Sequence, residues 1–417
     1  MPDLALEELK AQWNELADFV EPGTEGWTRR VFSEAYLEER DWLEKQFRSA
    51  GCDHVERDHA GNIIGVVKGK YCGLAPLVIG SHTDTVEAAG RYDGIVGVLG
   101  SLDVIRRLLS TDRRLNRDLY VYDFLGEEVN EFGIGCLGSK ALVGELSSTD
   151  LNRTSEAGVR LGDHFAKWGL DPHRALSASN ATHPRRWQAY LELHIEQATS
   201  LENSGTQVGV VTAIAGIRRL VAKFVGEQNH AGGTRMSERK DALLAAARAA
   251  LIVNETACGS SEYAVGTTTS IENGTRSLNV ISGSAIMRSE IRAIKNHWLD
   301  KAERDIAQRI NAIAENNGVE SQIKWTLDNP VTKCDRTLQD VIIASCERAG
   351  ASWKAVPSGA THDAAHIAEA CPAAMIFVPS VDGKSHCPDE YTSWIDIAMG
   401  IEVLYEAVLR ADKGPNR

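Results

Sequence analysis

Short apolar segments that end beside a histidine or a carboxylate alternate with segments of helical periodicity along this chain. Residues 77–80 and 119–124 are apolar and strand-like, and helical patterns follow them at 95–109 and 139–146. Strands that alternate with helices predict an α/β fold with a mainly parallel sheet. Side chains that follow parallel strands meet at one edge of the sheet, so this order also predicts where a functional site lies.

The remaining segments of the first and last thirds fit the same architecture. Helical periodicity covers residues 3–19 and 33–48, and residues 54–68 alternate in polarity around a glycine turn, which predicts a hairpin. Residues 148–186 are polar and predict a surface excursion. Residues 338–410 return to alternating helix and short strand.

The middle of the chain has a different texture, which predicts a second domain. Its expected order is β-α-β-β-α-β, with strands at 217–226, 263–271, 284–294 and 322–327 and helices at 241–254 and 298–316. A chain of 417 residues is long for one hydrophobic core. We therefore predict a ferredoxin-like insert at 215–329 that interrupts a catalytic domain formed by 1–214 and 330–417.

Composition narrows the class of partner. The formal net charge is -13 and no long basic stretch is present, which argues against nucleic acid and favours a small-molecule substrate. The eight cysteines lack CxxC spacing, as expected for reduced thiols in the cytoplasm. The start of the chain lacks the pattern of a secretory leader, and no run approaches the roughly 20 apolar residues of a membrane span. We expect a cytoplasmic protein without membrane attachment.

Potential metal ligands follow the predicted strands or occupy glycine-rich loops. They are His82, Asp93, Glu127, Glu128, His194 and His386. Imidazoles and carboxylates that converge in this way suit a pair of divalent cations, and a shared aspartate can bridge two cations roughly 3.5 to 4 Å apart. Each histidine taken alone is more commonly a hydrogen-bonded core or loop residue, and a lone Glu-Glu pair is more commonly a solvated helix start. The combination favours a hydrolase.

Two spacings in the sequence indicate specific roles for residues in or beside this set. His82 and Asp84 are two residues apart, so in extended backbone they point to the same side and the carboxylate can orient the imidazole. Glu127 and Glu128 are neighbours and project differently, so one can bind metal while the other faces the activated water. Cys387 stands beside His386, but an oxygen- and nitrogen-rich centre does not need sulfur, and we interpret it as a bystander.

Several motifs together resemble the M20 metallopeptidase superfamily. They are Gly-Ser-His-Thr-Asp-Thr-Val at 80–86, Gly-Arg-Tyr-Asp-Gly at 90–94, Glu-Glu at 127–128, His-Ile-Glu-Gln at 194–197, His-Ala-Gly at 230–232, Ser-Gly-Ala-Thr-His-Asp-Ala at 358–364 and Ser-His-Cys-Pro-Asp-Glu-Tyr-Thr at 385–392. More narrowly, they look like its branch of N-carbamoyl-L-amino acid hydrolases, allantoate amidohydrolases and β-ureidopropionases. The likeness runs from about residue 32 to the end.

The resemblance implies a dimetal centre and a role for each of its residues. His82 and His194 would hold one cation, Glu128 and His386 the other, and Asp93 would bridge them. Glu127 would be the general base, and Asp84 would support His82. Zinc is the expected ion, with manganese, cobalt or nickel as alternatives.

The resemblance also implies that the insert is a dimerisation and lid domain of a homodimer. His230 would reach into the partner's site and polarise the scissile carbonyl. Asn279 and Arg292 would hold the substrate carboxylate, because a guanidinium matches a carboxylate with two parallel hydrogen bonds. Gln197 and the backbone of Gly359 and Ala360 would add polar contacts near the ureido or amide group.

The predicted function is therefore a metal-dependent amidohydrolase that cleaves a linear C–N bond of a small carboxylate-bearing substrate with metal-activated water. An N-carbamoyl-L-amino acid is the first expectation, and allantoate is the second. An N-acyl amino acid hydrolase or dipeptidase, and a non-catalytic ligand-binding dimer, are further alternatives. The chain departs from the family pattern at Ala89, Ala198, Gly233, Arg235 and Thr361. None of these departures removes a ligand, but several bear on substrate choice.

Overall fold

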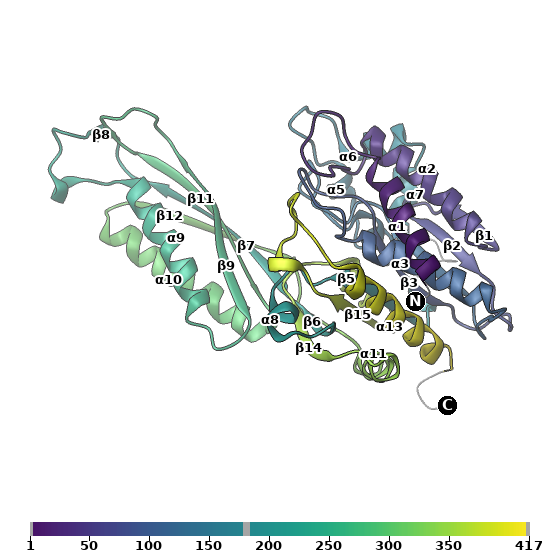
Figure 1. Ribbon diagram of the computed structural model, residues 1–417. Helices are drawn as coiled ribbons and strands as arrows, with labels where there is room; N and C mark the ends of the chain where they lie inside the picture. Colours follow the sequence, from purple (N-terminus) through teal and green to yellow (C-terminus); the bar gives the residue numbers. More distant parts are fainter. Residues whose placement is uncertain (1–2, 178–183, 414–417) are drawn as a thin grey trace. The chain divides into compact units, whose positions relative to one another are not determined.

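The computed structural model describes residues 3–177 and 184–413, and the chain divides into two compact units (Figure 1). The first unit comprises Met1–Thr212, Lys333–Val356 and His362–Arg417. The second unit comprises Ala213–Thr332 and Pro357–Thr361. The expected boundaries at 214/215 and 329/330 lie within three residues of these, but residues 357–361, which were expected in the catalytic domain, belong to the second unit.

A nine-stranded sheet runs through the first unit in the order β1-β2-β4-β3-β5-β15-β6-β13, with β14 paired to β6. The strands are β1 (His54–Arg57), β2 (Ile63–Val67), β3 (Leu77–His82), β4 (Leu119–Phe124), β5 (Ala189–Ile195), β6 (Val208–Ile214), β13 (Thr332–Lys333), β14 (Trp353–Ser358) and β15 (Ala373–Val378). The chain leaves this sheet after β6 and returns to it at β13, which is the neighbouring strand.

The centre of this sheet is parallel. Strand β3 pairs in parallel with β4 and β5, and β15 pairs in parallel with β5. Strands β3, β5 and β15 are buried along their whole length. This burial explains the apolar start of β3 and the continuous apolar run of β15. The predicted α/β fold with a mainly parallel central sheet is confirmed, and β1 and β2 form the predicted antiparallel hairpin.

Helices of the first unit pack in groups against the sheet. Helix α13 contacts both α3 and α11, and all three contact the parallel strands. Helices α4 and α12 contact each other; α4 also contacts β4, and α12 contacts β5 and β15. The helices are α1 (Asp3–Ala17), α2 (Glu34–Ser49), α3 (Ile95–Ser110), α4 (Leu137–Val143), α5 (Ser148–Leu151), α6 (Leu161–Lys167), α7 (Pro172–Ala175), α8 (Ser200–Ser204), α11 (Arg336–Ala349), α12 (Asp363–Ile367) and α13 (Trp394–Lys413), with 3-10 turns η1 (Pro184–Arg186) and η3 (Val381–Gly383).

The predicted surface excursion at 148–186 is anchored to the first unit. It contains α5, α6, α7 and η1, and residues 178–183 lie outside the described residues. Leu161 and Phe165 are fully buried in a cluster with Tyr36 and Leu137. The excursion therefore contributes to the core as well as to the surface.

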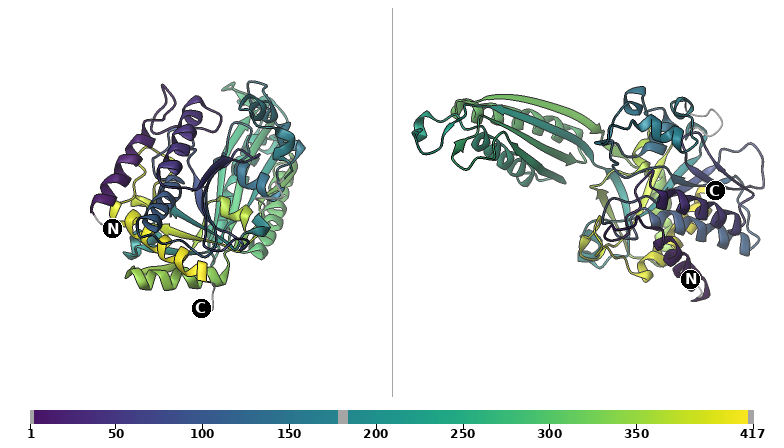
Figure 2. Two further views of the ribbon diagram at one scale, coloured as in Figure 1. Left: turned by 90° about the vertical axis from the view of Figure 1, so that its right-hand side faces the viewer. Right: turned by 90° about the horizontal axis from the view of Figure 1, so that it is seen from above.

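The second unit is a four-stranded antiparallel sheet with two helices on one face (Figures 1 and 2). Its sheet order is β12-β7-β11-β9. The elements are β7 (Gly216–Val225), β8 (Asn229–His230), η2 (Met236–Glu238), α9 (Ala242–Cys258), β9 (Ala264–Asn273), β10 (Val280–Ile281), β11 (Ser284–Ala293), α10 (Asn296–Asn316) and β12 (Glu320–Asn329). Apart from the short β8/β10 ribbon, their order along the chain is β-α-β-β-α-β.

The second unit has its own core, which explains why it forms a compact unit. Strand side chains such as Phe224 and Met287 are fully buried against Ile306 and Ile310 of α10 and against a row of alanines on α9. Small side chains on α9 let the helix approach the sheet closely. Among helices of the described residues, none combines the length and apolar character that a membrane span requires. All eight cysteines are free thiols.

Candidate metal centre and active site

His82, Asp93 and His194 form a first group of potential ligands. His82 ends β3, Asp93 lies in the loop before α3, and His194 lies near the end of β5. Asp93 Oδ1 is 3.0 Å from His194 Nε2 and 3.7 Å from His82 Nε2. One ligand atom from each of the three residues lies within 4.8 Å of the other two.

Asp93, Glu128 and His386 form a second such group. Asp93 Oδ2 is 3.2 Å from His386 Nε2, which in turn is 3.0 Å from Glu128 Oε1. Asp93 thus belongs to both groups, and each of its two oxygens faces one of them. The five residues that the sequence predicted as metal ligands come together at the carboxyl edge of the sheet.

A glycine allows the loop with Asp93 to approach His82. Gly94 has a φ of 65°, and a Cβ at this position would lie 2.5 Å from the imidazole ring of His82. Any larger residue would collide with a ligand and would strain the backbone. The short Asp93-Gly94 segment therefore brings the bridging carboxylate directly beside the end of β3.

The electrostatics of this cluster suit divalent cations. Burial opposes protonation of His386, but hydrogen bonds and charges of Asp93 and Glu128 outweigh it and raise the pKa of His386 to about 11. Burial is likewise outweighed at His82, whose pKa is raised well above its ordinary value by Glu127, Asp84 and Asp93. Raised histidine pKa values report a strongly negative potential, which bound cations neutralise with release of protons. Nitrogen and carboxylate donors are also the ligands that zinc and related metals prefer.

Glu127 lies next to both ligand groups without belonging to either. It is 8% exposed, and its Oε2 is 3.6 Å from His82 Nε2. The thiol of Cys136 donates to Glu127 Oε1 at 3.5 Å. Burial raises the pKa of Glu127 well above its ordinary value, and the charges of Glu128 and Asp363 act in the same direction. A buried carboxylate of high basicity is suited to proton transfer.

Asp84 contacts both His82 and the loop that carries Glu127 and Glu128. His82 Nδ1 hydrogen-bonds to the backbone carbonyl of Asp84 at 3.1 Å, while the Asp84 carboxylate is 3.6 Å away. That carboxylate accepts the backbone N–H groups of Glu127 and Glu128, both at 3.1 Å. Asp84 therefore joins the end of β3 to the loop with both glutamates.

Gln197 contacts the ligands in this structure. Its Nε2 donates to Asp93 Oδ2 at 2.5 Å and to Ser385 Oγ at 3.3 Å, and its φ of 55° is left-handed. The side chain expected to touch substrate thus lies against the shared aspartate.

The expected substrate residues of the second unit form two separate pairs. His230 and Asn279 lie together at the β8/β10 ribbon, where His230 is opposite Val280 and the N–H of Ala231 donates to the Asn279 carbonyl at 2.8 Å. Arg292 on β11 donates to the Gly359 carbonyl at 3.1 Å. The N–H of Ala360, the residue after Gly359, donates to Ser358 Oγ at 3.2 Å.

Asn279 and Arg292, the two residues expected to hold the substrate carboxylate, lie at opposite ends of the second unit. Ser284 pairs with Val225 and Ala293 with Gly216, so β11 runs from the ribbon end of the unit to the end where β7 begins. Arg292 lies eight residues beyond Ser284, which is about 26 Å of strand. Figure 1 shows β8 beyond the start of β11. Asn279 therefore shares its location with His230 and not with Arg292.

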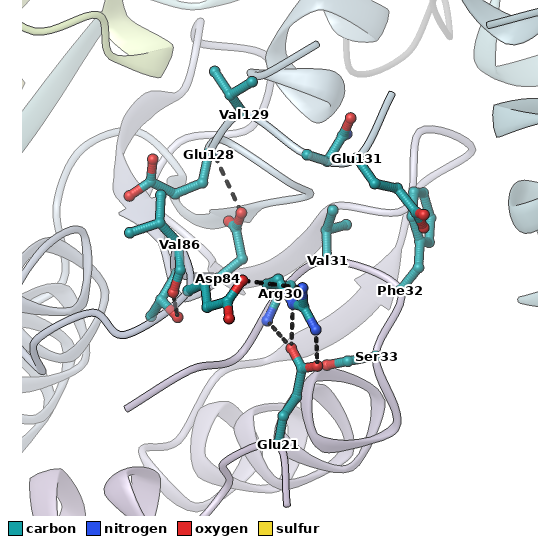
Figure 3. Close-up of a pocket in the computed structure, with 13 residues that line it drawn as sticks. Glu21, Arg30, Val31, Phe32, Ser33, Asp84, Val86, Glu128, Val129 and Glu131 are labelled. Atoms are coloured by element: carbon teal, nitrogen blue, oxygen red, sulfur yellow. Dashed lines mark hydrogen bonds and ion pairs between the residues drawn. The ribbon is translucent and has the colours of Figure 1, made fainter. Parts of the chain in front are cut away.

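A pocket of about 430 Å³ adjoins the ligands within the first unit. Figure 3 shows Asp84 and Glu128 on one side of it and Phe32 and Glu131 on the other. Its floor includes Arg30, whose guanidinium is paired with Glu21 at 2.7 Å. Space of this size beside the ligands can hold a small organic molecule.

The sequence did not predict a third buried group of potential ligands, which shares His194 with the first group. Glu192, His194 and His362 have ligand atoms within 4.8 Å of one another, and the rings of His194 and His362 meet edge to face with centroids 4.4 Å apart. Burial lowers the pKa of His362 well below its ordinary value, which keeps the ring neutral. Glu192 stands two residues before His194 on β5, and this spacing is the signal that identifies it.

The fold and the ligand cluster define a class of metallohydrolase, and comparison with known proteins identifies the family. Residues 78–410 match the model of peptidase family M20/M25/M40, and the chain belongs to this family. The family resemblance noted in the sequence is confirmed.

Particular relatives narrow the likeness to one branch. The chain is 33% identical to an N-carbamoyl-L-amino acid amidohydrolase of Geobacillus stearothermophilus over 96% of this chain and 98% of that protein. It is 32% identical to a ureidoglycolate hydrolase of Oryza sativa, and the match covers 96% of this chain and 84% of that protein. A solved amidase of the hydantoinase/carbamoylase family from Burkholderia multivorans superimposes with a TM-score of 0.87 at 29% identity, covering 97% of each chain.

Proposed function

We propose that this chain is a metal-dependent amidohydrolase that cleaves a linear amide or ureido C–N bond in a small carboxylate-bearing substrate. Its preferred substrate is an N-carbamoyl-L-amino acid. The observation that carries the proposal is the pair of ligand groups that share Asp93, with Glu127 beside them. The full-length likeness to an N-carbamoyl-L-amino acid amidohydrolase supports the choice of substrate.

The ligand assignment follows from the two groups. His82 and His194 would hold one cation, Glu128 and His386 would hold the other, and Asp93, which belongs to both groups, would serve both. Zinc is the expected ion, with manganese, cobalt or nickel as alternatives for a site of imidazoles and carboxylates. Two bound cations would polarise the scissile carbonyl and activate a water molecule.

In this proposal Glu127 transfers the proton, and Asp84 and Gln197 hold neighbouring residues in place. Glu127 takes a proton from the attacking water and delivers it to the leaving nitrogen, because its buried carboxylate has a raised pKa. Asp84 holds the backbone of both glutamates through the N–H groups that it accepts. Gln197 steadies Asp93. The pocket beside Glu128 leaves space for the substrate.

The second unit is a ferredoxin-like dimerisation and lid domain in this proposal. Arg292 binds the substrate carboxylate together with the backbone of Gly359 and Ala360, from its position beside Gly359. His230 and Asn279 act as a pair in the site of the other subunit, where His230 stabilises the oxyanion that forms at the carbonyl. Their shared location on the β8/β10 ribbon supports a joint role.

A substrate panel tests the proposed activity. The purified homodimer is stripped of metal, reloaded with zinc or manganese, and assayed on N-carbamoyl, N-formyl and N-acyl amino acids, allantoate, ureidoglycolate and dipeptides. We expect the highest kcat/KM with an N-carbamoyl-L-amino acid. A clear preference for a dipeptide would make the chain a peptidase. Absence of turnover on every substrate, with two cations bound, would favour a ligand-binding dimer.

Replacing Arg292 with alanine is expected to raise KM for carboxylated substrates about 10- to 150-fold, because a hydrogen bond to a charged group contributes about 1.5 to 3 kcal/mol. For the same substrates with an esterified carboxylate, KM should change little. Steady-state kinetics on matched acid and ester pairs measure the difference. Arg288→Ala is the control, since Arg288 lies four residues earlier on the same strand and pairs with Glu272. An equal loss on acids and esters would refute carboxylate recognition by Arg292.

Mixing two inactive variants tests the role of His230 across the dimer. Heterodimers of His230→Ala and Glu127→Gln chains contain one intact site, so random pairing should restore about a quarter of wild-type activity. Subunit exchange is verified by mass spectrometry, and activity is followed as exchange proceeds. Chains with both changes, mixed in the same way, provide the control and should stay inactive. Verified heterodimers without recovery would place His230 in its own chain's site or outside catalysis.

A further inference from the structure

Glu390 is a buried carboxylate that contacts two of the three segments that supply the second ligand group, those of Asp93 and His386. It lies between β15 and α13, four residues after His386, and is 3% exposed. Its Oε1 accepts the backbone N–H groups of Tyr92 at 2.8 Å and Asp93 at 3.1 Å. Its Oε2 accepts the Ser385 hydroxyl at 2.9 Å and the His386 N–H at 3.3 Å.

The two oxygens of the Glu390 carboxylate thus accept hydrogen bonds from two segments, those of Asp93 and Ser385, which are 292 residues apart in the chain. The loop before Asp93 also packs closely on Glu390, because a Cβ at Gly90 would lie 2.3 Å from the Glu390 Cβ. The loop of Asp93 and the loop of His386 are therefore held against the same side chain.

Ser385 extends the connection to the ligand oxygen itself. Its Oγ is 2.6 Å from Asp93 Oδ2 and 2.9 Å from Glu390 Oε2. One hydroxyl proton serves one of these acceptors at a time, so Ser385 bridges the two carboxylates. Asp93 Oδ2 is the oxygen that faces His386, so the backbone and the side chain of Asp93 are both positioned from Glu390.

The two ligand groups differ in how much they need such support. His82 and His194 lie on β3 and β5, which are buried and hydrogen-bonded in the sheet centre. His386 lies in a loop, its side chain is 47% exposed, and its φ of 56° is left-handed. A loop ligand depends on neighbouring contacts for its position more than a strand ligand does.

We propose that Glu390 is a positioning residue that assembles the Asp93–Glu128–His386 ligand group by clamping the loops of Asp93 and His386 together. Its loss weakens the cation held by Glu128 and His386 much more than the cation held by His82 and His194. The inference rests on the proposed dimetal centre. Glu390 itself touches neither cation nor substrate.

Zinc binding to metal-free protein tests the proposal. Stepwise dissociation constants are measured by titration against a competing chelator, and bound zinc is counted by mass spectrometry, for wild type, Glu390→Gln and Glu390→Ala. Loss of a group that orients ligands typically costs 10- to 100-fold in metal affinity. We expect the weaker zinc to lose about 10- to 100-fold in affinity while the tighter zinc changes little. Glu390→Gln keeps the side-chain volume, so it remains informative if Glu390→Ala does not fold.

Asp412→Asn is the matched control for this experiment. Asp412 is 7% exposed and likewise accepts two consecutive backbone N–H groups, those of Asn116 and Arg117, at 2.9 and 3.1 Å. We expect it to lower thermal stability as the Glu390 variants do, but to leave both zinc affinities unchanged. Wild-type zinc affinities in both Glu390 variants, or equal weakening of both zinc ions, would overturn the positioning role. Fewer than two zinc ions in the wild type would instead overturn the dimetal centre.

Discussion

Replacing Glu127 with glutamine is expected to lower kcat by about 10²- to 10⁴-fold while two divalent cations remain bound. Glutamine has nearly the same volume as glutamate but cannot accept a proton at neutral pH. Glu127 belongs to neither ligand group, and its carboxylate lies 3.6 Å from His82 Nε2 and within reach of the Cys136 thiol. The substitution therefore removes the proposed base and leaves the five candidate ligands in place.

Metal content by mass spectrometry and steady-state kinetics check this result together. KM should change much less than kcat, because the lost interaction operates in the chemical step. Glu156→Gln, an exposed glutamate on the surface excursion, is the control and should behave as wild type. A Glu127→Gln enzyme with wild-type kcat would remove Glu127 from the base role, whereas loss of one cation would make it a ligand.

Replacing Arg40 with methionine is expected to destabilise the first unit by about 3 to 5 kcal/mol, because it leaves a buried charge without its partner. The Arg40 side chain is 1% exposed and the Asp123 side chain is 0% exposed, and their N···O distance is 2.8 Å. The same guanidinium donates to the Tyr36 hydroxyl and to the Gly61 carbonyl. Methionine keeps the apolar volume but supplies none of these hydrogen bonds.

This buried network lies beneath the ligands. Asp123 accepts the hydroxyl of Thr83 at 2.9 Å, and Thr83 follows His82 directly. Glu39 lies on the other side of Thr83, and burial, then the charge of Asp123, raises its pKa to about 8. Loss of Arg40 therefore leaves an uncompensated buried carboxylate near the end of β3, and we expect lower stability of this part of the first unit.

Urea unfolding followed by circular dichroism measures the effect of Arg40→Met. Arg114→Met is the matched control, because Arg114 pairs with Asp53 at 2.6 Å on the surface, where both side chains are one-third or more exposed. An exposed pair of this kind contributes about 0 to 1 kcal/mol. A double variant, Arg40→Met with Asp123→Asn, should regain part of the lost free energy of unfolding, because it no longer buries an unpaired carboxylate at position 123. Equal midpoints for Arg40→Met and Arg114→Met would contradict the proposed importance of the buried pair.

The sequence predicted the architecture of the first unit because its signals are local. The run Leu77–Ile79 is apolar because its strand is buried, and the helical repeat of α3 begins directly after a glycine. The same strand ends predicted the ligand set, since chain order alone places residues after parallel strands at one edge of the sheet. Local patterns could not show that residues 357–361 pack with the second unit, because that depends on contacts between distant segments.

Residue types and their order thus indicated an α/β fold, an inserted unit and five candidate ligands, whose side chains lie close together in the structure. Only the tertiary structure decided that one oxygen of Asp93 faces His194 and the other faces His386, that Asp84 holds the backbone of Glu127 and Glu128, and that Asn279 lies with His230. Glu390 illustrates the reason. Its partners are close in space but about 300 residues away in the chain, and no local pattern records a hydrogen bond between backbone and side chain over that separation.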